Sequence, residues 1–213
     1  MRYTRNMSFL RKCLLVLVPL VASIAAVQAA DKDKEAFKPG PAASYSAKQT
    51  SDGLTIAAVP YDSPELAKQA FGKMNPYQYG VLPVLIVIQN DSNKTIQLQH
   101  MTVEYIDADR NRVEATPARD VPYLGTHPKK PKVIDTPIPG VSVSSRAKKG
   151  PLSGWEIEGR AFTPRMLPGK ESASGFFYFQ TGHRSGAKLY VTGLQEAPSG
   201  KELLYFEIPL ETH

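Results

Sequence analysis

The sequence predicts an all-β protein, an antiparallel β-sandwich with one short helix and one long basic loop rich in proline. Three observations support this prediction. Short apolar or alternating runs recur between residues 53 and 210. Clusters of glycine, proline, asparagine and aspartate separate these runs about every 8–12 residues, a spacing typical of a β-sandwich. Only residues 64–71 carry clear helix signals at both ends.

Residues 1–29 have the pattern of a secretory signal peptide. The first dozen residues carry four basic residues and no acidic one, and an apolar run follows over residues 13–27. Charge followed by an apolar run is the order of an export signal. Small residues predict cleavage after Ala29, with cleavage after Ala30 as the less favoured alternative. An uncleaved anchor is the other alternative, but a spanning helix needs roughly 20 apolar residues. We therefore expect a secreted or periplasmic protein.

Removal of residues 1–29 changes what the composition indicates. The whole chain has 26 basic and 20 acidic residues and a pI near 9.3, but the signal segment holds four of the basic residues and none of the acidic ones. The mature chain is therefore close to neutral, which argues against nucleic-acid binding. Its only cysteine, Cys13, leaves with the signal, so disulfides and thiol chemistry are excluded. The remaining length suits one domain, and no second apolar run is long enough for a transmembrane span.

The mature chain is expected to begin with a leader. Residues 30–52 mix alternating charge with proline, glycine, alanine and serine. Such a composition cannot offset the entropy cost of ordering, so we expect a flexible leader, with a strand starting near Tyr45 as the alternative. The β-sandwich domain is then expected over residues 53–213, and its first strand over residues 53–60.

A single helix is predicted over residues 64–71. Ser63 is a suitable N-cap, Pro64 suits the first helical position and Glu65 favours the positive end of the helix dipole. Gly72 ends the helix.

The middle of the chain is predicted to form a central strand followed by two half-exposed strands. Residues 84–88 are β-branched and almost unbroken in apolarity, which is typical of a strand covered on both faces. Residues 90–93 form a turn cluster. Residues 95–98 and 102–106 alternate between apolar and polar, so we expect strands with one exposed face.

A long basic insert is predicted over residues 125–151. It holds five prolines, three glycines and six basic residues but one acidic residue, Asp135. A loop of this length inside a domain is either functional or disordered, although residues 141–143 could form a short edge strand. Its charge suits an anionic surface, and the candidate anion-binding residues are Lys129, Lys130, Lys132, Arg146, Lys148 and Lys149.

The last third of the chain again predicts strands. We expect them at residues 154–157, 174–179, 188–192 and 202–210, separated by glycine and proline turns. The aromatic residues at 176–179, together with Tyr205 and Phe206, are assigned to the interior, because aromatic residues on strands usually pack in the core.

Two patches resemble bacterial extracellular immunoglobulin-like domains. In those domains an apolar strand ends in a V-x-N turn that leads to a K-x-I-x-L strand, here residues 88–90 and 94–98. A later L-P-G at residues 167–169, followed by Gly175, precedes a strong apolar strand at 176–179. The resemblance implies an immunoglobulin-like β-sandwich in a secreted or surface-attached module, of a kind mostly without assigned catalysis.

Residues 107–111 have the D-x-D-x-N spacing that opens a calcium loop. The rest of that motif is missing, because Arg112 replaces its glycine and Ala118 replaces its glutamate. We therefore interpret the segment as a hairpin turn whose side chains bond their own backbone.

Other catalytic patterns are weak. Residues 140–144 lack the second glycine of a G-x-S-x-G elbow. Glu156 and Glu158 would share one face of a strand, where we expect them to be surface residues. No cofactor or metal site is predicted.

These observations favour a secreted, non-enzymatic binding module whose partner is a protein or an anionic envelope polymer. One alternative is a hydrolase or metal-dependent enzyme assembled from distant residues, for which His100, His127, Asp107 and Asp109 are the candidate ligands. Another is a structural envelope component that acts by β-strand addition at an exposed edge.

Overall fold

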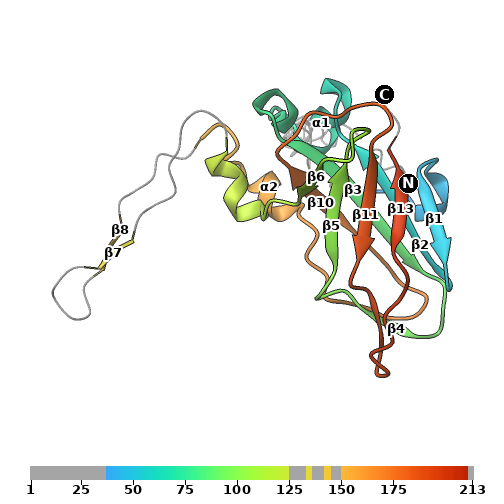
Figure 1. The fold of residues 1–213 in the computed structure, drawn as a ribbon. Helices are drawn as coiled ribbons and strands as arrows, with labels where there is room; N and C mark the ends of the chain where they lie inside the picture. Colours follow the sequence, from blue (N-terminus) through green and yellow to red (C-terminus); the bar gives the residue numbers. More distant parts are fainter. Residues whose placement is uncertain (1–36, 125–132, 136–141, 145–149, 211–213) are drawn as a thin grey trace, which may run out of the picture. The chain divides into compact units, whose positions relative to one another are not determined.

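A computed structural model describes residues 37–124, 133–135, 142–144 and 150–210 (Figure 1). The described chain is mostly β, with three antiparallel sheets of three or more strands, one two-stranded hairpin and few helices. The predicted signal peptide and the six basic residues proposed to bind anions lie outside the described residues.

The first sheet has the strand order β1-β2-β3-β10 and is antiparallel throughout. Its strands are β1 (Lys48–Ser51), β2 (Leu54–Pro60), β3 (Leu82–Asn90) and β10 (Ser172–Phe179). Strand β3 is central and buried along almost its whole length, which confirms the prediction for residues 84–88.

The second sheet has the order β13-β11-β5-β6. Its strands are β5 (Thr102–Ile106), β6 (Arg112–Glu114), β11 (Lys188–Thr192) and β13 (Phe206–Pro209). Buried and less buried residues alternate along β11 and β13, as expected for strands with one face toward solvent.

A third, smaller sheet has the order β12-β4-β9. It contains β4 (Thr95–Gln97), β9 (Met166–Leu167) and β12 (Gln195–Ala197). Asn90, at the end of β3, fastens this region, because its buried side-chain amide donates to the carbonyl oxygens of Lys94, Leu167 and Pro168 at 2.7, 3.2 and 3.0 Å. Its Oδ1 accepts from the Ser92 backbone, which confirms a turn at 90–93.

The two four-stranded sheets share one hydrophobic core. Alternate residues of β2 and β3, such as Ile56 and Ile86, face it from the first sheet, and Tyr105, Leu189 and Phe206 face it from the second. All five are fully buried.

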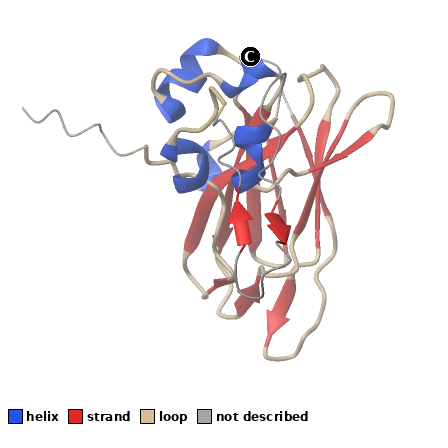
Figure 2. Cartoon of the chain, turned by 90° about the vertical axis from the view of Figure 1, so that its left-hand side faces the viewer, coloured by secondary structure: helices blue, strands red, loops and turns tan. Residues whose placement is uncertain are grey.

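A second core lies on the opposite face of the first sheet. Leu85, Val87 and Phe176 contribute to it from β3 and β10, and Phe71 and Ile157 contribute from helices. Figure 2 shows the helices gathered beside the strands. They are α1 (Pro64–Phe71), α2 (Trp155–Gly159) and the 3₁₀ helices η1 (Ala42–Ser44), η2 (Pro76–Tyr79) and η3 (Ala118–Tyr123). Their main strand contacts are with β2, β3 and β10.

Helix α1 has the predicted bounds. Ser63 Oγ accepts a hydrogen bond from the Leu66 backbone at 3.3 Å, and Pro64 occupies the first turn. Gly72 follows the helix with φ of 65°, a conformation that favours glycine.

The expected flexible leader over 30–52 is wrong for its described part. Residues 37–51 have no periodic sequence pattern, but burial of their side chains holds them against the domain. Ala42 is fully buried, and the Phe37 ring packs against Phe176 at 5.5 Å between centroids. The Lys48–Ser51 strand pairs with β2, so the first sheet includes residues before position 53, as the alternative of a strand starting near Tyr45 expected.

The predicted strand at 154–157 is also wrong, because this segment forms α2. The alternation of Trp155, Glu156 and Ile157 resembles the period of a strand. Ile157 nevertheless packs into the second core, and its carbonyl oxygen accepts a hydrogen bond from Tyr178 Oη at 2.7 Å. This tertiary contact outweighs the local pattern.

Two described segments of the 125–151 insert pair with each other. Strand β7 (Val133–Asp135) and β8 (Ser142–Ser144) form a two-stranded antiparallel hairpin, which extends the short strand expected at 141–143. Within the described residues, no helix is long and apolar enough to cross a membrane.

Candidate functional site

The outer face of the β13-β11-β5-β6 sheet carries polar and aromatic side chains. Tyr190 lies opposite Glu104 of β5 and Glu207 of β13 in the strand register. Its neighbours along β11, Leu189 and Val191, point into the core and are fully buried. The period of two along a strand therefore places Tyr190 on the solvent side.

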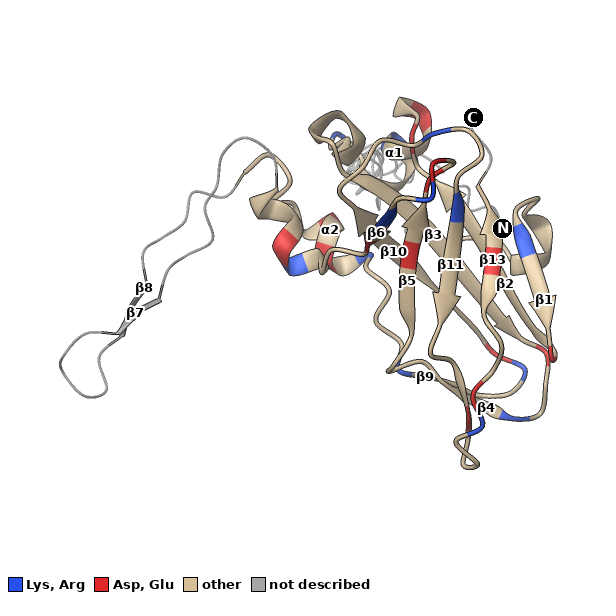
Figure 3. Cartoon of the chain, viewed as in Figure 1, with Lys and Arg blue, Asp and Glu red and all other residues tan. Residues whose placement is uncertain are grey.

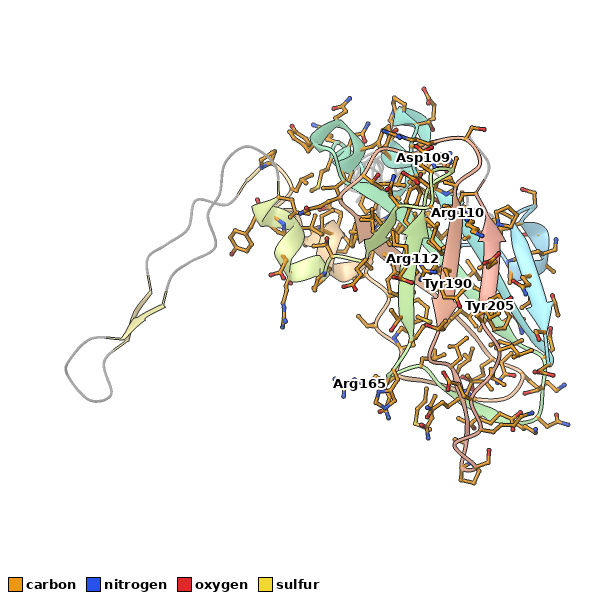
Figure 4. All side chains as sticks on the ribbon, viewed as in Figure 1. Asp109, Arg110, Arg112, Arg165, Tyr190 and Tyr205 are labelled. Carbon is orange, nitrogen blue, oxygen red and sulfur yellow. The ribbon has the colours of Figure 1, made fainter. Side chains whose placement is uncertain are left out.

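Three planar groups form a continuous row on this face, which we call the tyrosine–arginine ridge: Arg112, Tyr190 and Tyr205. The Arg112 guanidinium lies 5.3 Å from the centre of the Tyr190 ring. The Tyr190 and Tyr205 ring centres are also 5.3 Å apart, with the rings tilted by 33°. Figure 4 shows the three side chains in sequence across the sheet.

The ridge is exposed and held in place. The Arg112 side chain is 56% exposed, and Tyr205 is 52% exposed. Arg112 Nη1 donates to Glu104 Oε2 at 2.9 Å, a contact that fixes the guanidinium above the Tyr190 ring. The expectation that Tyr205 lies in the interior is therefore wrong: regular pairing in β13 begins at Phe206, and Tyr205 precedes it on the surface.

The β5–β6 turn positions Arg112. Asp107 Oδ1 accepts from the Asn111 backbone and Asp107 Oδ2 accepts from the Asn111 side chain, both at 2.8 Å. The hydrogen bond from the Asn111 side chain lowers the pKa of Asp107. Arg110 adopts φ of 67° in the turn, and Asp109 pairs with Arg184 at 3.5 Å. The segment is thus the predicted hairpin turn.

Charges around the ridge are mixed in sign. Lys188 Nζ pairs with Glu207 Oε2 at 3.1 Å on the same face. Figure 3 shows basic and acidic segments interspersed over β5, β11 and β13. Such a surface suits a partner with mixed charge better than a uniform polyanion.

The candidate metal ligands do not gather. His100 precedes β5 and Asp107 follows it, so the length of the strand, about 3.4 Å per residue, keeps them at opposite ends. Asp109 is at the Asp107 end, and His127 lies outside the described residues. Among the described residues, no group of three His, Cys, Asp or Glu side chains is placed to hold a metal ion. Glu156 and Glu158 lie on α2, where residues two apart do not share a face.

A buried histidine that the sequence did not single out lies near the α1 end of the first sheet. His183 Nε2 is 3.9 Å from Asp62 Oδ2, and His183 Nδ1 is 3.4 Å from Tyr105 Oη. The His183 and Asp62 side chains are only 1% and 10% exposed, so this cluster cannot contact a substrate without rearrangement. No sequence spacing could reveal it, because its members come from three distant segments.

A shallow groove, which we call the edge groove, runs along the β10 and β6 side. Two adjacent cavities of about 480 and 470 Å³ share Met101, Phe162 and Phe177 as lining residues. The Phe162 and Phe177 rings stack at 5.4 Å. Gly175 makes this approach possible, since a Cβ there would lie 2.5 Å from Phe162 Cα.

No family model and no curated protein matches the chain. Among solved structures, the Northeast Structural Genomics Consortium target SoR45 aligns with a TM-score of 0.31 at 11% identity, over 78% of this chain and 97% of that one. The putative ApaA protein from Bordetella pertussis aligns with a TM-score of 0.31 at 9% identity, over 79% and 99% of the respective chains. Similarity at this level supports no conclusion about fold or function.

Proposed function

We propose that the chain is an exported, non-enzymatic binding module with an immunoglobulin-like β-sandwich, and that it contacts a protein partner through the tyrosine–arginine ridge. The observation that carries this proposal is the exposed row of Arg112, Tyr190 and Tyr205 on an otherwise regular sheet face.

The composition of the ridge is that of an interaction hot spot. Tyrosine and arginine are enriched among residues that dominate binding energy. Tyrosine has few rotatable bonds, so it loses little entropy on binding. The contact of Arg112 with Glu104 and Tyr190 fixes the guanidinium before a partner arrives. Pre-organisation of this kind increases affinity by lowering the ordering cost.

Export supports a binding role outside the cytoplasm. The proposal rests here on the charge and apolar pattern of residues 1–29. An anionic envelope polymer is the other partner class, and it would use the basic residues of the insert rather than the ridge.

Site-specific photo-crosslinking in the producing cell tests the proposal. A photoreactive amino acid replaces Tyr205 in one strain and Tyr79 in a control strain, since Tyr79 is a similarly exposed tyrosine on η2, away from the ridge. We expect a discrete protein adduct from position 205 that disappears when Arg112→Ala and Tyr190→Ala are added. Equal adducts from both positions, or an adduct insensitive to these substitutions, would contradict the proposal.

The start of strand β10 favours a second candidate function, β-strand addition. Strand β10 ends the first sheet, and the bridges alongside it involve Phe176 and Tyr178, so in the described chain Ser172–Ser174 pairs only with β3. An extended segment of a partner could pair there. Crosslinking from Ser174, which is exposed on this edge, would support this function if the adduct survives loss of the ridge, whereas an adduct lost together with the ridge adduct would argue against it.

A further inference from the structure

Arg160 lies near two aromatic rings. Its backbone ends α2 and joins β10, because its carbonyl oxygen accepts from the Phe176 backbone at 2.9 Å. Its guanidinium carbon lies 5.2 Å from the centre of the Phe37 ring and 5.7 Å from that of the Trp155 ring.

One guanidinium nitrogen has no acceptor. Arg160 Nη1 is buried and makes no hydrogen bond in the described structure. Aromatic faces attract the positive charge, but they are weak acceptors for an individual N–H. A buried N–H of a charged group without an acceptor costs free energy, which an incoming acceptor recovers.

The charge of Arg160 also lacks an acidic neighbour at ion-pair distance among the described residues. The Arg160 charge nevertheless affects two tyrosines of the second core. Burial raises the pKa of Tyr61 and of Tyr178, and the Arg160 charge opposes part of each rise. The guanidinium is therefore a positive charge next to apolar surroundings, where an anion would interact strongly.

We propose that Arg160 is a carboxylate-binding site, with Trp155 as its outer wall and Phe37 as its inner wall. A carboxylate is flat and accepts two parallel N–H bonds from one guanidinium. A flat ligand matches a planar guanidinium beside two aromatic rings better than a tetrahedral phosphate does. Trp155 is 62% exposed, so rotation of its indole can uncover the guanidinium.

Two sources could supply the carboxylate. One is the chain itself, because Asp31, Asp33 and Glu35 shortly precede Phe37 in the sequence. The other source is a side chain or C-terminus of a partner. The chemistry at Arg160 is the same for both, and it does not depend on the ridge.

Trp155 is the only tryptophan in the chain, so its fluorescence reports directly on this site. The mature protein is titrated with sodium acetate against sodium chloride at constant ionic strength. A second protein carries Asp31→Asn, Asp33→Asn and Glu35→Gln. Both proteins are also made with Arg160→Met and with Arg160→Lys. The lysine variant keeps the positive charge and serves as the comparison if the methionine variant does not fold.

We expect a saturable acetate-specific change in Trp155 emission that is lost in Arg160→Met and at least tenfold weaker in Arg160→Lys. A response of equal strength in both leader forms identifies an external carboxylate as the ligand. A response confined to the leader-neutralised protein, or much stronger in it, identifies the leader as the occupant. The absence of any Arg160-dependent response in both forms would overturn the proposal.

Discussion

The outer faces of the two large sheets differ in what covers them. Over the first sheet, helices and the chain from Phe37 build a second hydrophobic core on β3 and β10. Over the second sheet, the outward side chains described include the exposed Arg112 and Tyr205. The two faces therefore have different tasks: the covered face stabilises the fold, and the uncovered face is available for contact.

The two faces also differ in the sequence patterns of their strands. The covered strand β3 is apolar at successive positions, because both of its faces are buried. The uncovered strand β11 alternates, and Tyr190 occupies one of its outward positions. Under the proposed function, an aromatic residue at an outward position of an alternating strand marks the contact surface, whereas one in a continuous apolar run belongs to the core.

The largest expected difference between the two faces is in how much a side-chain truncation lowers the free energy of unfolding. Phe176 is fully buried and touches the rings of Tyr61 and Phe71, with centroids at 4.8 and 4.9 Å. We expect Phe176→Ala to lower the free energy of unfolding by about 3–5 kcal/mol. Tyr190→Ala should lower it by about 1 kcal/mol or less. Urea unfolding measures both, and similar losses would refute the division of tasks between the faces.

A smaller loss of stability is expected at the end of β3. Asn90→Ala leaves three carbonyl oxygens without the buried amide donor, which should cost about 2–3 kcal/mol. Asn93→Ala is the matched control, because Asn93 is exposed in the same turn. If the two variants have equal urea midpoints, the amide does not fasten the third sheet.

The smallest expected effect on the free energy of unfolding at neutral pH comes from the ionisation of the buried tyrosines. Burial raises the pKa of Tyr178 and of Tyr61 above the ordinary value near 10. Above about pH 10 the unfolded state therefore binds fewer protons than the folded state, and the free energy of unfolding falls as pH rises; below that pH this contribution is fully present.

Tyr178→Phe should consequently reduce the alkaline loss of stability, after correction for its own cost at pH 7 from the lost hydrogen bond to Ile157. Unfolding followed from pH 7 to 12 measures this. An unchanged alkaline slope in both Tyr178→Phe and Tyr61→Phe would show that these groups do not govern it.

Local signals predicted much of the fold. The Ser63 cap, Pro64 and Gly72 define α1, and the continuous run at 84–88 identifies a central strand. The segments that were mispredicted depend on distant contacts. Residues 37–51 have a composition typical of disorder but are held by Phe37 and Ala42, and α2 forms where Ile157 can be buried.

The candidate site was only partly predictable. The strand that carries Tyr190 follows from alternation at 188–192, but the rule that aromatic residues on strands usually pack in the core places Tyr205 in the interior, whereas it is exposed. The approach of Arg112 to Tyr190 joins segments far apart in sequence, and no spacing rule encodes it. Burial of His183 and the unpaired nitrogen of Arg160 likewise arise only from the tertiary structure.

The affinity of the crosslinked partner tests the central claim most directly. Isothermal titration of that purified partner compares the mature protein with Tyr190→Ala, Arg112→Ala and the control Tyr79→Ala. Loss of a hot-spot residue costs about 2 kcal/mol or more, so we expect each ridge variant to weaken binding roughly 30-fold or more. Tyr79→Ala should bind like the unaltered protein. Ridge variants that stay folded and bind with unchanged affinity would contradict the assignment of this face as the contact surface.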